Sequence, residues 1–214
     1  MSALGCILLG YLIGGINPAY LIGRRRGFDI RKRGSGNAGA SNAVIVMGKK
    51  VGVLSALFDI FKSFLTVRLS AWLFPTFAYA TILAGVACIL GHMYPVFLGF
   101  RGGKGLACLG GMILAYDWAF FLALLSSELI LVLIVDYICV VPITASIIFP
   151  VVYALRSKNL IGTLILLVST FFILLKHIEN LKRIRKGTEA HFSFLWKRDQ
   201  EIERLMGDSS AKKQ

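Results

Sequence analysis

The sequence predicts an all-α polytopic membrane protein, a bundle of about seven transmembrane helices with three motif loops on the cytoplasmic side. Composition, the spacing of apolar segments and the placement of basic residues support this prediction. Of the 214 residues, 57% are hydrophobic and only 16% are charged, whereas soluble domains carry about a quarter charged residues. We expect a transmembrane domain at 1–190 and a basic, partly disordered cytoplasmic tail at 191–214.

The first three apolar segments are each long enough to cross a bilayer. Residues 3–23 contain no charge, and we interpret them as a retained span because no cleavage site follows. Residues 51–74 and 76–98 form the next two predicted spans, with Pro75 as the turn between them. A hydrocarbon core of ~30 Å requires roughly 17–25 residues per helix.

Polar residues divide the apolar region from 105 to 175 into four shorter segments, 105–116, 118–135, 137–155 and 160–175. If the basic segments before and after this region lie on one side of the membrane, an even number of spans must join them. Four short spans give seven in total, and two long spans give five. We favour seven, because four short helices fit this length better.

The net charge of +13 is unevenly distributed along the chain. All but four of the 24 Lys and Arg residues lie in three segments, 24–50, 101–104 and 176–213. The positive-inside rule places these segments in the cytoplasm and the N-terminus outside. Because the basic segments alternate with spans, the expected partners are membrane lipids and not nucleic acid.

Three polar segments carry the candidate chemistry, and the first is "GSGNAGASN" at 34–42. Gly34, Gly36 and Gly39 allow backbone N–H groups to approach an anion closely. The side chains of Ser35, Asn37, Ser41 and Asn42 add hydrogen-bonding groups. The glycines match a dinucleotide motif, but that motif must follow a strand. A flexible polar loop is the alternative.

The second segment is "GHMYPVFLGFRGGKG" at 91–105. Gly102, Gly103 and Gly105 surround Lys104 at the start of a predicted helix, where N–H groups and the helix dipole favour an anion. It is not a Walker A loop, because Gly105 replaces the required Ser or Thr. For His92, a structural role and a functional role are equally compatible with the sequence.

The third segment is "HIENLKRIRKGTEAHF" at 177–192. On a helix, His177, Asn180 and Arg183 share one face, whereas Glu179 and Lys182 point elsewhere. Gly187 ends this helix and Glu189 follows it. A basic helix that touches lipid headgroups is the alternative, but it leaves the His, Asn and Glu residues unexplained.

Together these segments resemble the PlsY-type acyl-phosphate:glycerol-3-phosphate acyltransferases of bacteria. The likeness covers most of residues 8–190, in order and at family spacing. It implies a multi-pass protein of the bacterial cell membrane that acts in phospholipid synthesis. The implied reaction transfers a fatty acyl group from acyl phosphate to glycerol 3-phosphate, giving 1-acylglycerol 3-phosphate (lysophosphatidate) and phosphate. The resemblance implies no metal or other cofactor, and an acyl-phosphate synthase as functional partner.

The resemblance also implies site residues. The expected catalytic residues are Ser35, Lys104, His177, Asn180 and Glu189. The expected substrate-binding residues are Gly34, Gly36, Asn37, Gly39, Ser41, Asn42, His92, Arg101, Gly102, Gly103, Gly105 and Arg183.

These residues have different expected roles. Lys104 and the N–H groups of its neighbouring glycines bind phosphate. Ser35 and Asn37 contact the donor phosphate or the carbonyl oxyanion. His177 and Asn180 orient the acceptor hydroxyl, and Glu189 holds Arg183 or its loop. The general base is either His177 or a substrate phosphate oxygen.

The chain departs from the family pattern at Ile45, which stands where the first motif has Arg. Losing that charge-assisted contact removes ~1.5–3 kcal/mol of phosphate binding. Lys49, Lys50 or Arg101 could substitute for it. A related protein with an altered acceptor, or an inactive relative, is therefore the first alternative.

Polar residues within the predicted spans suggest a second alternative, a small transporter. Asp59 and Lys62 are three residues apart and could pair, while Glu128 has no obvious partner. Such residues in a membrane often mark ion or proton pathways. The motif clusters, however, lie at span ends and not near the bilayer midplane. Cys6, Cys88, Cys108 and Cys139 lie in apolar segments without zinc or disulfide spacing.

Overall fold

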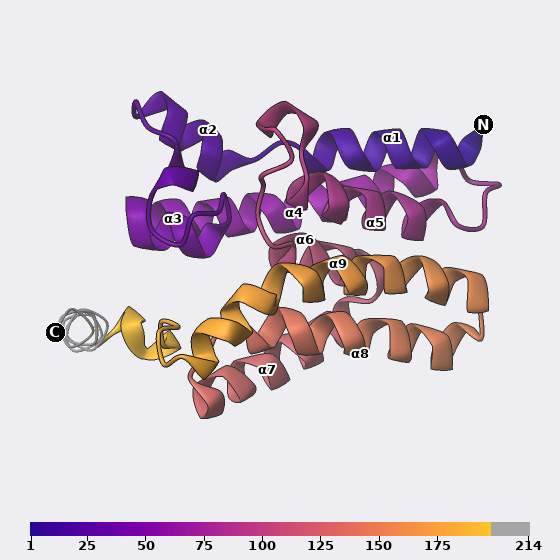
Figure 1. Cartoon of the computed structure of the whole chain (residues 1–214). Helices are drawn as coiled ribbons and strands as arrows, with labels where there is room; N and C mark the ends of the chain where they lie inside the picture. Colours follow the sequence, from indigo (N-terminus) through magenta and orange to yellow (C-terminus); the bar gives the residue numbers. More distant parts are fainter. Residues whose placement is uncertain (198–214) are drawn as a thin grey trace, which may run out of the picture.

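The structure is a computed structural model that describes residues 1–197, and this part of the chain is entirely helical (Figure 1). Its α-helices are α1 (Ser2–Gly14), α2 (Pro18–Arg25), α3 (Ala40–Met47), α4 (Lys49–Leu73), α5 (Ala80–Met93), α6 (Leu106–Tyr116), α7 (Trp118–Val135), α8 (Val140–Ser157) and α9 (Leu160–Arg185). Two short 3₁₀ helices lie between them, η1 (Ile30–Lys32) and η2 (Val96–Leu98), and a third, η3 (Phe192–Leu195), follows α9. The part of the predicted basic tail beyond residue 197 lies outside the described residues.

Five helical segments of the described chain are long and apolar enough to cross a membrane. They are Ser2–Arg25, Ala80–Leu98 and the three helices α7, α8 and α9. The other two predicted spans also contain helices. Helix α6 is apolar but has only 11 residues, and α4 has 25 residues but carries buried charges. The all-helical prediction with several candidate spans is therefore confirmed.

The first predicted span, residues 3–23, is not one continuous helix. Helix α1 ends at Gly14, and Pro18 opens α2 with Asn17 as its cap, whose Oδ1 accepts from the Tyr20 N–H at 2.8 Å. Proline lacks an N–H and is favoured at the first turn of a helix. The third predicted span also ends early, because α5 stops at Met93, two residues before Pro95.

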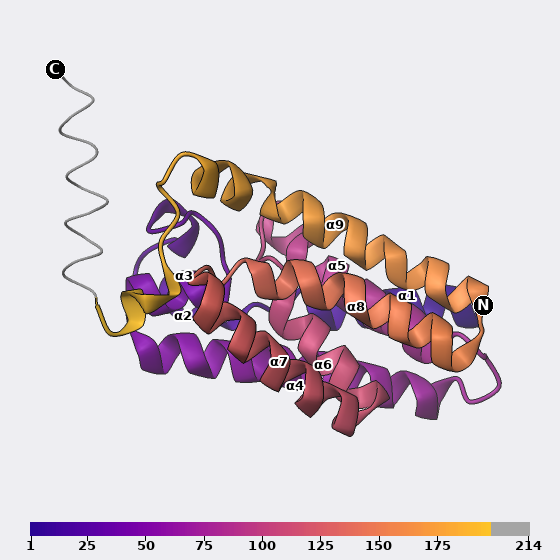
Figure 2. The ribbon, with the colours of Figure 1, turned by 90° about the horizontal axis from the view of Figure 1, so that it is seen from below.

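Small residues allow α1 and α5 to pack closely. A Cβ added to Gly10 would lie 2.2 Å from the Ala84 carbonyl oxygen, and one added to Gly14 would lie 2.1 Å from the Cys88 carbonyl oxygen. Such close backbone approach is typical of helix pairs in membranes. Helices α8 and α9 form a second close pair, which is antiparallel and runs side by side in Figures 1 and 2.

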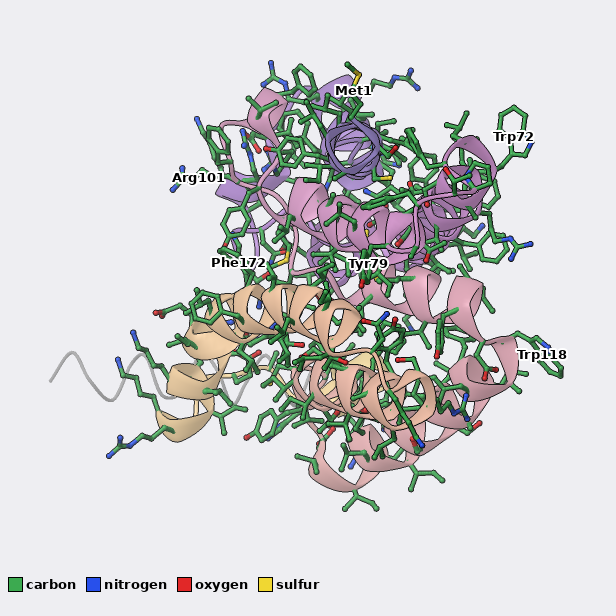
Figure 3. The ribbon with its side chains drawn as sticks, turned by 90° about the vertical axis from the view of Figure 1, so that its right-hand side faces the viewer. Met1, Trp72, Tyr79, Arg101, Trp118 and Phe172 are labelled. Carbon is green, nitrogen blue, oxygen red and sulfur yellow. The ribbon has the colours of Figure 1, made fainter. Side chains whose placement is uncertain are left out.

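The two ends of the bundle differ in composition. Helices α2 and α3 and the C-terminal end of α9, all parts of the basic segments, lie at one end of the molecule in Figure 1. Trp72 and Trp118 project outward elsewhere, from the end of α4 and the start of α7 (Figure 3), and are 75% and 68% exposed. Because Trp is enriched at membrane interfaces, this arrangement agrees with a bundle oriented across a bilayer.

Glu128 does have a partner, contrary to the sequence-based expectation. Both of its carboxylate oxygens lie 2.7 Å from the Thr144 hydroxyl on α8. The partner could not be identified from local spacing, because it lies on the next helix. The four cysteines are free and buried, as their apolar surroundings predicted.

Candidate active site

The glycine-rich segment 34–42, here called the serine loop, is organised around Asn42. The Asn42 side chain is completely buried. Its Oδ1 accepts from the Ser35 N–H at 2.8 Å, and its Nδ2 lies 2.7 Å from the Asn37 carbonyl oxygen and 3.1 Å from that of Ile30. All polar atoms of this side chain are used inside the loop. This corrects the expected substrate contact, because Asn42 instead holds the loop in shape.

Ser35 and Asn37 are the side chains that this loop presents. Asn37 Nδ2 donates to Ser35 Oγ at 2.8 Å, and Asn37 Oδ1 accepts from the Gly39 N–H at 2.8 Å. Ser35 is exposed, and its hydroxyl hydrogen is still available for donation. Gly34 and Gly36 have φ values of +57° and +77°, in the left-handed region that favours glycine. Glycine at these two positions therefore lets the loop turn without backbone strain.

Residues 99–105, here called the lysine loop, fold back onto the end of α5. The N–H groups of Gly102 and Gly103 donate to the carbonyl oxygens of Met93 and His92, each at 3.1 Å. These two N–H groups were expected to bind phosphate, and the structure instead uses both inside the chain. Gly105, with φ +92°, precedes α6. The anion-binding groups that remain in the lysine loop are therefore Lys104 and the start of α6.

The serine loop and the lysine loop touch through their backbones. The Ala38 N–H donates to the Gly102 carbonyl oxygen at 3.3 Å. A Cβ added to Gly39 would lie 3.8 Å from the Gly103 Cα. Two segments that lie far apart in the sequence are thus brought together.

Lys104 connects these loops to α9 through a chain of polar contacts. Its Nζ donates to Asn180 Oδ1. Asn180 Nδ2 donates to Glu189 Oε1 at 2.5 Å, and Arg183 Nε donates to Glu189 Oε2 at 2.5 Å. Asn180 and Glu189 are buried. The predicted shared face of Asn180 and Arg183 is confirmed, and so is the contact between Glu189 and Arg183.

Lys104 lies in an environment that weakens its hold on a proton. Burial lowers the pKa of Lys104 to about 8, and the nearby positive charge of Arg183 acts in the same direction. The carboxylate of Glu189 opposes both effects. Below pH 8 the side chain is therefore a cation with a single direct side-chain acceptor, Asn180, among the described residues. Such a cation is suited to bind an anionic ligand.

His177 lies three residues before Asn180 on α9 and is buried. Its Nδ1 lies 2.8 Å from the Ile173 carbonyl oxygen. Because a carbonyl oxygen only accepts, Nδ1 carries the hydrogen and Nε2 keeps a free lone pair. A neutral imidazole in this form can accept a proton, as a general base must.

A second polar cluster, of Asp59, Lys62 and His92, lies inside the bundle. Lys62 Nζ is 2.6 Å from Asp59 Oδ1 and 3.2 Å from His92 Nδ1. It also donates to the carbonyl oxygens of Gly14 at 2.9 Å and Ile16 at 2.6 Å. The predicted pairing of Asp59 with Lys62 is confirmed. His92, expected to bind substrate, is only 3% exposed and belongs to this structural cluster.

The same cluster contains a possible set of metal ligands. Asp59, His92 and Cys108 each place one ligating atom within 4.8 Å of the others. The ammonium group of Lys62 is in direct contact with two of these residues and balances the Asp59 carboxylate. The ammonium group of Lys62 therefore already supplies a positive charge beside these residues.

Three predicted or discussed positions lie at the surface. Arg101 is exposed at the outer edge of the molecule (Figure 3), and Ser41 is exposed on the first turn of α3. The Ile45 side chain is 45% exposed. A longer cationic side chain at position 45 would therefore meet no buried obstacle.

Arg31 has a part that the sequence analysis missed, because it was counted only as a basic charge. Its guanidinium forms a two-oxygen contact with Asp29, at 3.0 and 2.7 Å, and donates to the Leu98 carbonyl oxygen. The bond from Arg31 lowers the pKa of Asp29 to about 2. This pair anchors the segment before the serine loop to the lysine loop; the D-x-R spacing was the available signal.

Comparisons with known proteins identify the family. A sequence model of the family described as glycerol-3-phosphate acyltransferase matches residues 4–187. The chain is 34% identical over 207 residues to the glycerol-3-phosphate acyltransferase of Lactiplantibacillus plantarum, covering 95% of this chain and 100% of that one. It is 38% identical over 203 residues to that of Enterococcus faecalis, covering 88% and 91%.

Solved structures agree with this assignment. The fold matches crystal structures of PlsY, an integral membrane glycerol 3-phosphate acyltransferase, at 33% identity. The TM-score is 0.83 for the glycerol 3-phosphate form, covering 91% of this chain and 98% of that one. For the lysophosphatidic acid form the TM-score is 0.80. This chain, a multi-pass integral membrane acyltransferase, belongs to the glycerol-3-phosphate acyltransferase family.

Proposed function

We propose that this enzyme transfers a fatty acyl group from acyl phosphate to glycerol 3-phosphate, giving 1-acylglycerol 3-phosphate and inorganic phosphate. The observation that carries the proposal is that the lysine loop contacts both other segments, the serine loop through Gly102 and α9 through the bond from Lys104 to Asn180. The related crystal structures, described in glycerol 3-phosphate and lysophosphatidic acid forms, support the acceptor and the product. An acyl-phosphate synthase would supply the donor.

The arrangement suggests a division of roles. Lys104 and the N-terminus of α6 bind substrate phosphate, since both present positive charge. Ser35 and Asn37 donate to the donor phosphate or to the carbonyl oxyanion. Asn180, held by Glu189, orients the acceptor. These assignments are proposals that rest on contacts among the residues themselves.

The reaction needs no covalent enzyme intermediate, because an acyl phosphate is already activated. The acceptor hydroxyl oxygen attacks the acyl carbonyl carbon, the bond from that carbon to the phosphate oxygen breaks, and phosphate leaves. The hydroxyl proton passes to a base, either Nε2 of His177 or an oxygen of a substrate phosphate. Positioning and charge stabilisation provide most of the rate enhancement in such a site.

The proposed topology has seven spans in the domain 1–190, with the N-terminus outside and the C-terminus in the cytoplasm. Helices α1, α4, α5, α6, α7, α8 and α9 would each cross once. The positive-inside rule supports this orientation. Since four helices lie between the lysine loop and the end of α9, both would lie on one side, as their contact requires.

Two alternatives remain distinct from this proposal. An altered acceptor or an inactive relative is favoured only by Ile45, which lacks the motif charge. A transporter is less well supported, because Asp59 pairs with Lys62 and Glu128 with Thr144. The acyltransferase proposal thus has more structural support than either alternative function.

The test is an acyl-transfer assay of the purified protein with palmitoyl phosphate and radiolabelled glycerol 3-phosphate. We expect labelled 1-acylglycerol 3-phosphate, and a loss of about 10²–10³-fold in kcat/KM for Lys104→Ala. Lys182→Ala is the matched control, because this exposed lysine on α9 pairs with Glu179 and lies on another face of the helix than Asn180. No product from the wild-type protein, or near-normal turnover by Lys104→Ala, would contradict the proposal.

A further inference from the structure

The chain after α9 folds back onto the turn between α7 and α8. The Phe192 N–H donates to the Asp136 carbonyl oxygen at 2.7 Å. The Ser193 N–H donates to Asp136 Oδ1 at 2.7 Å, and the Ser193 hydroxyl donates to Oδ2 at 2.8 Å. His191 lies against Tyr137, with Nε2 3.2 Å from the phenol oxygen. Four polar contacts thus fasten residues 191–193 to this turn.

Asp136 adopts a backbone conformation that few residues other than glycine tolerate. It ends α7 with φ 61° and ψ 20°, in the left-handed region, where Asp and Asn are the best-tolerated alternatives to glycine. Glycine would fit this conformation without cost but has no carboxylate. Backbone strain of this kind persists where the side chain is needed, and here both carboxylate oxygens bind Ser193.

This attachment closes a short loop that contains Glu189. At its start, Gly187 has φ +69°, and the Thr188 N–H donates to the Arg183 carbonyl oxygen at 2.9 Å. At its end, Ser193 is fastened to Asp136. Glu189 lies between these two points and is only 8% exposed. The two attachments thus hold the loop at both ends while the Glu189 carboxylate faces Asn180.

We propose that Asp136 and Ser193 form a clasp that positions Glu189, and through Glu189 holds Asn180 and Lys104 in register for the proposed reaction. Both are positioning residues, since neither touches the residues that bind substrate. Ser193 also lies beyond residues 4–187, the part matched by the family model. Of the two experiments described below, only the kinetic measurement rests on the proposed function.

The clasp predicts an effect on the charge of Lys104. The groups that act on Lys104 are Glu189, Arg183, Lys176, His177 and Cys139. Glu189 is the negative charge that raises the pKa of Lys104, against burial and the cations, which lower it. If the clasp opens and Glu189 moves away, the neutral amine is favoured, so the pKa of Lys104 falls.

The first experiment measures Lys104 directly, without acyl transfer. Purified full-length protein is treated with trace acetic anhydride between about pH 6 and about pH 10, a range that brackets the amine. Mass spectrometry then gives the acetylation of Lys104 at each pH. For Asp136→Gly we expect the midpoint to fall by about half a pH unit, which raises labelling below the midpoint about threefold. Ser193→Ala, which keeps the Ser193 N–H contact, should shift the midpoint less.

Two comparisons show whether the clasp acts through Glu189. Lys158→Gly is the matched control, because Lys158 also ends a helix with positive φ, at 52°; it should leave the Lys104 midpoint unchanged. The double variant Asp136→Gly with Glu189→Gln should have the midpoint of Glu189→Gln alone. Additive shifts, or an unchanged midpoint in both clasp variants, would overturn the proposal.

The second experiment measures kinetics with palmitoyl phosphate and glycerol 3-phosphate. Asp136→Gly should lower kcat/KM for glycerol 3-phosphate about tenfold, as expected for a misplaced binding group, and should change KM for palmitoyl phosphate less than about twofold. An equal rise in both KM values would contradict positioning through Asn180. If the wild-type protein makes no product, the proposed function fails, while the labelling experiment still decides the clasp.

Discussion

Two lysines of this protein, Lys62 and Lys104, lie in different surroundings, which suit them to different roles. Lys62 is enclosed in the bundle, and its ammonium contacts Asp59 and two backbone carbonyl oxygens. All three of its hydrogens are used, so it has nothing left for a ligand. Lys104 is only half-buried and has one side-chain acceptor, Asn180. A lysine becomes a structural brace or a ligand site according to how many acceptors the fold places around it.

The largest expected effect is the loss of protein stability when the buried pair of Asp59 and Lys62 is broken. Lys62→Met leaves the Asp59 carboxylate buried without its cation, which costs about 3–5 kcal/mol. We expect a strongly lowered thermal unfolding temperature in detergent. Adding Asp59→Leu should recover part of this loss, because the unpaired charge is removed. If Lys62→Met alone were as stable as the wild type, Lys62 would not have the structural role that distinguishes it from Lys104.

The next largest effect is expected from restoring the positive charge that the family motif has at position 45. Ile45→Arg adds a guanidinium at an exposed position, and a charge-assisted contact with phosphate contributes ~1.5–3 kcal/mol. We expect kcat/KM to rise about tenfold or more in the acyl-transfer assay. Ile45→Gln, which adds length without charge, is the control. Equal rates for both variants would mean that Lys104 and its neighbours already supply enough positive charge.

The pH dependence sharpens the comparison further. In the proposed function Lys104 binds phosphate as a cation, and its pKa is lowered to about 8 mainly by burial. The value of kcat/KM should therefore be constant just below pH 8 and fall about tenfold for each unit above it. Lys104→Arg, which stays charged at all these pH values, should lose this alkaline limb. If kcat/KM of Lys104→Arg still fell above pH 8, that fall would be due to the titration of another group.

The smallest effect is expected on the outer face of α9. Glu179 and Lys182 form an ion pair at 2.9 Å, with side chains 69% and 61% exposed. Exposed pairs contribute about 0–1 kcal/mol. Glu179→Ala should leave the unfolding temperature unchanged. It should change kcat/KM by less than about twofold. A larger loss of activity would mean that the acceptor site extends to the face that points away from Asn180.

Local patterns predicted the parts of this site that depend on one element. The shared face of Asn180 and Arg183 follows from helical spacing, and the turns at Gly34 and Gly36 follow from glycine itself. Ser35 and Asn37 are presented by that same loop. The resemblance added the family, which the comparisons with known proteins confirm.

Local patterns failed where a partner from elsewhere in the chain takes a group. Gly102 and Gly103 have N–H groups that a glycine-rich sequence makes available, but the carbonyl oxygens at the end of α5 accept both. Asn42 has the composition of a ligand residue, yet the loop uses its whole side chain. Composition tells which groups can bind a ligand, and not which groups remain unpaired after folding.

By itself, the sequence determined that this chain is a helical membrane protein with several apolar segments, and it singled out the three polar segments that hold the candidate site residues. Apolar length, charge distribution and helical spacing are local properties, so they can be read without a structure. Only the tertiary structure decided that Lys62 braces the break after α1 while Lys104 is left for a ligand. Each lysine's acceptors lie on other segments, and only folding brings them within hydrogen-bonding distance.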